Sequence, residues 1–370
     1  MNLQLLSLIG YSVLLISLGL WIGRRVDSSA SFFVAGRSLG PVLIFSTILA
    51  ANIGAGSTVG AAGLGYRDGL SAWWWVGSAG LGTLILGLWL GPKIRHLAAL
   101  HDMHTVGDYL EHRYGPEVRA TVAVLLWLGT LAILAGQFIA MAWILEVVAG
   151  VPKIWGCLIG GTVVAVYFAA GGLLTSAWVN LVQLVVLIIG FALALIWVMP
   201  EGGLGAVLAA APRESPSYLS FWKGGASGLR YIALLVPAFM ISPGLIQKVF
   251  GARDDRAVRL GVGASGIALM AFAIVPPLMG MIARYYDPAL ANPELALPTL
   301  LTVALPPFVG GIALAAVLSA ELSSADAILF MLSTSLSKDL YGRFLNPSAS
   351  DALILKVSRL AALGGGALGV

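Results

Sequence analysis

Residues able to hold a cation or a proton lie close together in a long apolar stretch near the C-terminus. The segment 318–342, LSAELSSADAILFMLSTSLSKDLYG, has a membrane-length helical pattern that carries Glu321, Ser323, Ser324 and Asp326 within two turns. An ionisable side chain at bilayer depth costs roughly 2.5–3.5 kcal/mol even on mild insertion scales, so it is rarely there without a role. Hydroxyl and carboxylate oxygens are the ligands that small hard cations prefer. The pattern is typical of an ion-coupled membrane protein.

The composition of the whole chain also indicates a membrane protein. Of 370 residues, 59% are hydrophobic and only 10% are charged, whereas soluble domains average about 25% charged residues. The formal net charge of +4 favours anionic lipid headgroups over nucleic acid, because no basic stretch is interleaved with aromatic residues. A single cysteine, Cys157, excludes a disulfide framework within the chain.

Runs of about 20 apolar residues predict nine membrane spans and the start of a tenth. They cover approximately residues 3–23, 41–64, 70–92, 120–149, 152–170, 175–198, 228–250, 258–283, 306–336 and 352–370. If successive spans cross the membrane in alternating directions, most Lys and Arg residues, including Lys248, fall in loops on one side. These loops are 24–40, 93–119, 248–259 and 337–359. The positive-inside rule makes these loops cytoplasmic. We therefore expect a multi-pass protein of the inner (plasma) membrane with its N-terminus outside.

The first span is not expected to be a cleavable signal peptide. Its positive charges, Arg24 and Arg25, follow the apolar stretch instead of preceding it, and no small-residue cleavage site comes after it. We interpret it as a retained transmembrane helix.

Two of the predicted spans contain helix-breaking residues near their middle. The second span places Gly54, Gly56 and Gly60 among polar residues, and the seventh contains Pro243 followed by Gly244. Close helix packing through small residues and a simple proline kink are the alternative explanations. Two broken spans five crossings apart favour an inverted repeat, in which the freed backbone groups line a binding site at mid-membrane.

All four histidines fall in the loop 93–119. A metal site formed by His101, His104 and Asp108 is one interpretation, and a helix at the membrane interface is the other. We favour the interfacial helix, because no second ligand pair has tight spacing.

Several stretches of the sequence, taken with their order and spacing, resemble the sodium:solute symporter family. They are FFVAGRSLG (Phe32–Gly40), AANIGAG (Ala50–Gly56), QKVFGARDDRAVR (Gln247–Arg259) and SSADAILFMLSTSLSKDLY (Ser323–Tyr341), with GGLLTSAWVNLVQ (Gly171–Gln183) as a looser fifth. The resemblance runs from about Phe32 to the C-terminus. It implies an all-α, polytopic transporter with a LeuT-like five-plus-five inverted-repeat core, and no enzymatic activity.

The same resemblance implies a domain organisation and a sodium site. Residues 1–370 would form a single transporter domain, with an extra helix at 3–23, a first repeat at 41–198 and an incomplete second repeat at 228–370. The expected sodium ligands are the carbonyl groups of Ala50, Ile53 and Ala320 and the hydroxyl groups of Ser323 and Ser324. No cofactor is expected besides sodium as the coupling ion.

Three positions depart from the family pattern or leave their role open. Asn180, a candidate for an ion relay, stands where many members have an acidic residue on an accessory ion path, and Glu321 stands where sugar-transporting members have an apolar residue. Glu321 could replace the missing charge or allow proton coupling. Asp326 could relay ions or form a structural pair with an adjacent helix.

The solute pocket is expected beside the two helix breaks at Gly56 and at Pro243–Gly244. Candidate lining residues are Asn52, Gly54, Ser57, Trp75, Gln137, Phe239 and Ser242. Trp73 to Trp75 could cap this pocket or form an interfacial aromatic belt, and Gln137 could instead make one interhelical hydrogen bond. Few polar side chains are available to a sugar, so we favour an amino acid or a monocarboxylate.

The second repeat contains fewer helices than the first, so we expect further helices beyond residue 370 in the intact protein. The leading functional hypothesis is sodium-coupled secondary active symport by alternating access. The alternatives are proton-coupled symport through Glu321 and Asp326, or a transporter-like membrane domain that senses a solute for a signalling protein. A membrane enzyme is disfavoured because no nucleophile–base arrangement is present. The expected partners are the solute, sodium and the lipid bilayer; the sequence does not indicate an oligomeric state.

Overall fold

The computed structural model describes residues 3–212, 215–224 and 228–370. Its helices follow the apolar stretches of the sequence, and many of them end near glycine or proline residues. The α-helices in this part of the chain are α1 (Leu3–Gly23), α2 (Ser29–Val34), α3 (Pro41–Asn52), α4 (Ala61–Asp68), α5 (Trp73–Ile85), α6 (Gly91–Leu100), α7 (Val106–Tyr114), α8 (Pro116–Ala149), α9 (Lys153–Val198), α10 (Gly203–Ala209), α11 (Gly228–Met240), α12 (Pro243–Val249), α13 (Asp255–Phe272), α14 (Val275–Tyr286), α15 (Ala296–Val303), α16 (Pro307–Thr334) and α17 (Asp351–Gly369). Of three π-helical segments, Gly56–Gly60 leads into α4, and Leu86–Leu90 and Ser335–Leu345 continue α5 and α16.

Most of the long helices match predicted membrane spans, but one segment, Gly56–Leu100, covers the end of the predicted span 41–64 together with the span 70–92. Eight segments of the described chain are long and apolar enough to cross a bilayer. The longest, α9, has 46 residues, or about 69 Å at 1.5 Å per residue, which is twice the roughly 30 Å core of a bilayer. Gly172 divides it with a non-helical φ of 54° and ψ of −136°. Its two halves therefore correspond to the predicted spans 152–170 and 175–198.

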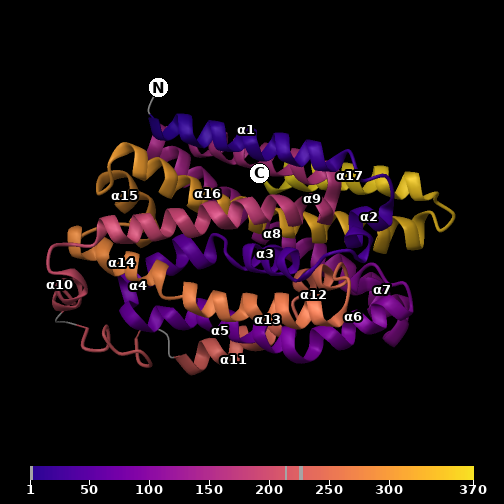
Figure 1. Ribbon diagram of the computed structural model, residues 1–370, viewed down its shortest axis with the longest axis horizontal. Helices are drawn as coiled ribbons and strands as arrows, with labels where there is room; N and C mark the ends of the chain where they lie inside the picture. The colour runs from indigo at the N-terminus through magenta and orange to yellow at the C-terminus, as the bar shows by residue number, and fades with distance from the viewer. Residues whose placement is uncertain (1–2, 213–214, 225–227) are drawn as a thin grey trace.

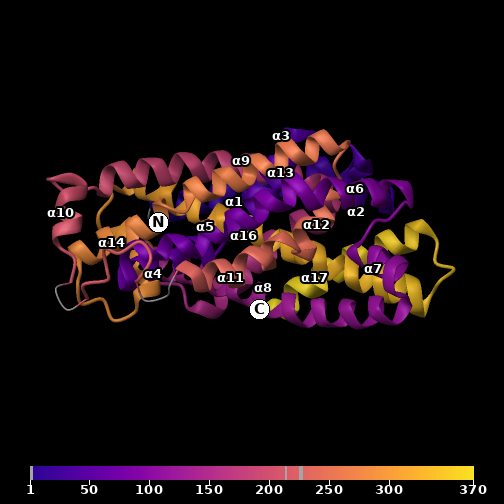
Figure 2. The ribbon, with the colours of Figure 1, turned by 90° about the horizontal axis from the view of Figure 1, so that it is seen from below.

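The helices lie side by side along one direction, with short elements gathered at both ends. In both views α4, α10 and α14 lie at one end of the molecule, and α2, α6 and α7 lie at the other (Figures 1 and 2). Helix α16 packs against α8, α9, α1 and α3, and almost all of its residues are buried. A long helix that carries several polar residues thus forms the centre of the bundle.

Both predicted helix breaks are present. α3 ends at Asn52 and the chain becomes helical again at Gly56, and α11 ends at Met240 before α12 begins at Pro243. Pro243 fits the first turn of α12 because its missing N–H would have had no partner there. The structure adds a break that we did not predict, between α13 and α14, where Ala273 and Ile274 interrupt the predicted span 258–283.

A short parallel bridge joins the start of the first broken helix to the end of the second. The Leu39 N–H donates to the carbonyl of Gly251, and the Arg253 N–H donates to the carbonyl of Leu39, both at 3.0 Å. The bridge ties α3 and α12 together, although more than 200 residues separate them in the sequence.

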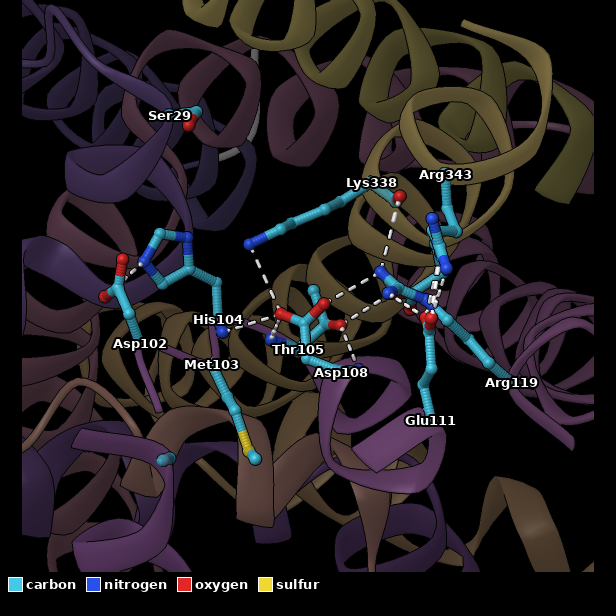
Figure 3. Close-up of polar contacts among 12 residues, drawn as sticks. Ser29, Asp102, Met103, His104, Thr105, Asp108, Glu111, Arg119, Lys338 and Arg343 are labelled. Atoms are coloured by element: carbon cyan, nitrogen blue, oxygen red, sulfur yellow. Dashed lines mark hydrogen bonds and ion pairs between the residues drawn. The ribbon is translucent and has the colours of Figure 1, made fainter. Parts of the chain in front are cut away.

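Charged side chains fasten α7 to the neighbouring ends of α8 and α16 (Figure 3). The Arg119 guanidinium contacts Asp339 at 2.7 Å, Glu111 at 2.8 Å and Asp108 at 2.9 Å. Lys338 lies 3.2 Å from Asp108, and Arg343 lies 2.6 Å from Glu111. Each of these charges has a partner of opposite sign. We therefore infer that this α7 cluster (Asp108, Glu111, Arg119, Lys338, Asp339 and Arg343) stabilises the packing of α7 against its neighbours.

The histidines near this cluster do not form a metal site. The Asp108 carboxylate accepts hydrogen bonds from the backbone N–H groups of His104 and Thr105 and so caps α7. The His104 ring lies 3.1 Å from Asp102, and the His101 ring stacks on His112. No group of three or more His, Cys, Asp or Glu side chains in the described chain could hold a metal ion.

We expect Gly172→Ala to destabilise the fold. A Cβ at residue 172 would lie 2.5 Å from the Phe32 carbonyl oxygen, and the backbone there adopts a conformation that costs other residues about 1–3 kcal/mol. The thermal unfolding midpoint in detergent should fall by several degrees. Gly129→Ala in α8, where a Cβ meets nothing within 4 Å, should leave it unchanged or raise it. An equal effect of the two substitutions would contradict this account of the α9 break.

We expect Asp108→Asn to destabilise the α7 cluster in a pH-dependent way. Burial acts to raise the pKa of Asp108, but the Lys338 and Arg119 charges and two backbone N–H groups outweigh it and hold the pKa below its usual 3.8. A carboxylate with a lowered pKa stabilises the fold at neutral pH, and this contribution is lost as the pH falls below that value.

At pH 7 the Asp108→Asn variant should therefore lose about 1–3 kcal/mol, measured as a lower unfolding midpoint, and its difference from the parent should shrink as the pH falls below about 3.8. Glu117→Gln, at an exposed position in the first turn of α8, serves as the control. A difference that persists unchanged at low pH would argue against the ionic origin of the stabilisation.

Candidate ion and solute site

The break after α3 frees backbone groups, and nearby side chains bind them. Ile53 is extended, with φ −103° and ψ 98°, so the helical hydrogen-bond pattern stops there. The Ala55 N–H donates to the side chain of Gln137 at 3.0 Å. The Ser57 hydroxyl accepts from the Gly54 N–H at 2.8 Å and lies 3.0 Å from the Asn52 carbonyl. An interrupted helix inside a membrane needs such partners because no water is available.

Serines of α16 contact the end of α3. The Ser323 hydroxyl donates toward the carbonyl oxygens of Ala50 and Ala320, both at 3.0 Å. The Ser324 hydroxyl donates to the Ala51 carbonyl at 3.2 Å. The helices approach closely here, and a Cβ at residue 54 would displace the side chain of Ser324.

The structure brings three of the five expected sodium ligands into direct contact. Ala50, Ala320 and Ser323 are in direct contact, and Ile53 is the extended residue at the break. Ser324 meets the carbonyl of Ala51, which the resemblance did not include. Carbonyl and hydroxyl oxygens form the donor set that suits a small hard cation.

Glu321 lies beside this group on the same helix. Its side chain is fully buried, and Oε1 accepts a hydrogen bond from the Thr58 hydroxyl at 2.8 Å. The other oxygen, Oε2, has no hydrogen-bond partner among the described residues. The carboxyl group therefore links α16 to the π-helical segment that follows the break.

Asp326 faces α9 and a buried lysine. Its carboxylate accepts from Ser176 at 2.9 Å and from the Tyr167 hydroxyl at 3.3 Å, and Lys248 Nζ lies 3.9 Å away. The prediction that Lys248 belongs to a cytoplasmic loop is wrong: α12 includes this residue, and its side chain is completely buried. The predicted span 228–250 already included Lys248, and this overlap with the loop 248–259 indicated a position inside the membrane.

Asn180 takes part in the same polar group, away from the predicted solute pocket. Its Nδ2 donates to Thr47 and Ser176, both at 3.1 Å. The contacts of Asp326 with α9 and α12 favour the structural pair over the ion relay.

A cavity of about 230 Å³ lies between the two helix breaks, and all seven predicted pocket residues line it. They are Asn52, Gly54, Ser57, Trp75, Gln137, Phe239 and Ser242. Gly56 and Gly244 from the breaks also line it, whereas Pro243 does not. The sequence analysis missed the apolar wall that Ala327, Ile328 and Met331 contribute. Their spacing from Ser324 puts them on the same face of α16, which was the available signal.

The structure separates the three tryptophans that the sequence left ambiguous. Trp75 lines the cavity and donates from Nε1 to the Gly56 carbonyl at 2.7 Å. Trp73 and Trp74 instead stack with Phe221, and Trp74 donates to the Phe221 carbonyl at 2.9 Å. Only Trp75 can cap the cavity.

Comparison with known proteins agrees with this arrangement. A family model described as "Sodium:solute symporter family" matches residues 32–369. The sodium/pantothenate symporter of Escherichia coli (strain K12) is 31% identical over 366 residues, covering 91% of this chain and 72% of the relative. The high-affinity proline transporter PutP of Bacillus subtilis (strain 168) is 26% identical, with 94% and 75% covered. The sodium/glucose cotransporter of Vibrio parahaemolyticus is 25% identical, with 95% and 71% covered.

The fold also resembles solved structures. A Na+-coupled sialic acid symporter in its substrate-bound outward-open state superposes with a TM-score of 0.88 at 17% identity, covering 100% of this chain and 81% of that one. The nucleobase-cation-symport transporter Mhp1 superposes with a TM-score of 0.63 at 16% identity, with 90% and 72% covered. The LeuT-like architecture expected from the sequence is confirmed, and the chain belongs to the sodium:solute symporter family.

Proposed function

We propose that this chain couples the movement of sodium across the membrane to that of a small organic carboxylate, by alternating access. Its N-terminus would lie on the outer side of the membrane. One observation carries the proposal: Gly54 and Ser324 belong both to the wall of the cavity and to the contact between α3 and α16. An ion that holds these helices together also shapes the cavity, so ion binding and solute binding are thermodynamically linked.

The expected sodium ligands are Ala50, Ile53, Ala320, Ser323 and Ser324. An ion at this place would draw the interrupted end of α3 against the continuous helix α16. We infer that it stabilises the conformation in which the solute can bind, and that bound solute then allows α3 and α12 to shift relative to α16.

The lining of the cavity favours a solute with one polar end. Its polar side chains include those of Asn52, Ser57, Gln137, Ser242 and Ser324, and no charged side chain of the described residues lines it. A solute with polar groups all round would leave several of them unpaired, at about 1–3 kcal/mol each. A carboxylate directed toward the helix breaks, with an apolar remainder against Phe239 and Met331, fits better.

The relatives are consistent with this choice but transport different solutes. Pantothenate and proline, named for two relatives, each contain a carboxylate, whereas glucose, named for a third, does not. We therefore favour an amino acid or a monocarboxylate over a sugar for this chain.

We expect uptake of such a solute into proteoliposomes to require an inward sodium gradient. Ser324→Ala removes a hydroxyl ligand, so the sodium concentration for half-maximal uptake should rise about tenfold, equivalent to 1.4 kcal/mol. Ser333→Ala, which removes a buried hydroxyl bonded only within α16, is the matched control.

Other outcomes discriminate the alternatives. Uptake driven by a proton gradient, with no sodium requirement, would shift the coupling role to Glu321, whose Oε2 is unpartnered. Solute binding without any uptake would support the sensor. An unchanged sodium dependence in Ser324→Ala would remove this serine from the site.

We expect Trp75→Phe to weaken solute binding without changing the sodium requirement. The substitution removes the hydrogen bond to Gly56 and part of the cavity wall, so the solute concentration for half-maximal uptake should rise several-fold. Trp74→Phe removes a similar bond outside the cavity and should have little effect. Equal effects of the two variants would show that Trp75 acts on the fold and not on the solute.

A further inference from the structure

Lys248 occupies an unusual position for a cation, in the interior of the helix bundle. Its side chain has no exposed surface. The ammonium donates to the Thr47 hydroxyl at 2.8 Å and to the Thr47 backbone carbonyl at 3.1 Å. The ammonium also forms an ion pair with Asp326, whose Oδ1 lies 3.9 Å from Lys248 Nζ. The charge therefore sits among oxygen atoms of α3 and α16, one turn of α3 away from Ala50.

The groups around this ammonium form an oxygen-rich surrounding. Ser176 Oγ hydrogen-bonds to Asp326 Oδ1 and to Asn180, and Asn180 also bonds to the Thr47 hydroxyl. Asn180 is fully buried, and its Oδ1 has no hydrogen-bond partner among the described residues. Carbonyl, hydroxyl, carboxylate and amide oxygens are the ligands that a hard metal cation would take.

The charges in this region balance without any added ion. Lys248 supplies one positive charge and Asp326 one negative charge, while Asn180, Ser176 and Thr47 are neutral. A further cation beside Thr47, Asp326 and Asn180 would meet no free carboxylate among these groups, because Asp326 is already paired with Lys248, and burying such a charge is strongly unfavourable.

We propose that the Lys248 ammonium takes the place of a second cation beside Thr47, Asp326 and Asn180, so that this chain binds one sodium ion in each transport cycle and not two. The inference rests on the proposed function for the first ion, at Ser323 and Ser324. The lysine acts as a covalently attached cation, and its presence determines how many sodium ions are transported with each solute molecule.

The test counts the sodium ions bound by the purified 370-residue chain in lipid nanodiscs, using radioactive sodium at saturating concentration. We expect one ion per parent chain and one additional ion in Lys248→Gln, where the carboxylate of Asp326 becomes available. Lys248→Arg keeps the charge, and the double variant Lys248→Gln/Asp326→Asn removes both charges; both should bind the same number of ions as the parent. Monodisperse elution during size-exclusion chromatography checks that each variant is folded.

Each result bears on the proposal separately from the first sodium site. Two ions on the parent chain would overturn it, whether or not the variants fold, and so would a folded Lys248→Gln variant that binds no additional ion. No ion on the parent but one on Lys248→Gln would support the role of Lys248 and refute the site at Ser323 and Ser324. In Lys248→Gln/Ser324→Ala, about tenfold weaker binding at one site only, with the other unchanged, would show that the two sites are distinct.

Discussion

The need to pair every backbone N–H and carbonyl group at membrane depth is the constraint on which the rest of the structure depends. Wherever a helix is interrupted at membrane depth, protein groups must bind the freed N–H and carbonyl groups. The break after α3 meets this need with Gln137, Ser57 and the hydroxyls of α16. Because α16 must supply polar groups to its neighbours, it is polar at intervals and yet almost wholly buried.

The spacing of those polar groups explains how one helix contacts several neighbours at once. Ala320, Ser323 and Ser324 share a face, since residues three and four apart lie together on a helix, and this face meets α3. Glu321 contacts Thr58 beyond the break, whereas Asp326 meets Ser176 and Tyr167 of α9. The candidate sodium ligands and the buried charge pair therefore lie on neighbouring faces of one helix, within two turns.

Hydropathy and helix-breaking residues predict most of this fold, because a bilayer demands long apolar spans and helix interruptions usually lie near glycine or proline. The break near Ala273 was missed although Pro276 and Pro277 follow it closely. The sodium ligands came from family resemblance, and spacing along α16 alone could not have supplied the carbonyls of α3. Lys248 was assigned to a loop although the predicted span 228–250 contained it. Its partners, Thr47 and Asp326, are distant in sequence, so only tertiary packing identifies them.

The position of Lys248 also links the two broken helices to α16. Its shorter contacts are with Thr47 of α3, and the bridge between Leu39 and Ala252 holds α3 to the segment after α12. Asp326 stands on α16, so any joint movement of α3 and α12 relative to α16 changes the 3.9 Å separation of the two charges. Coulomb energy varies steeply with distance in a medium of low dielectric constant. The buried pair must therefore contribute differently to the conformations on either side of such a movement, and it biases the same equilibrium that sodium binding between α3 and α16 would bias.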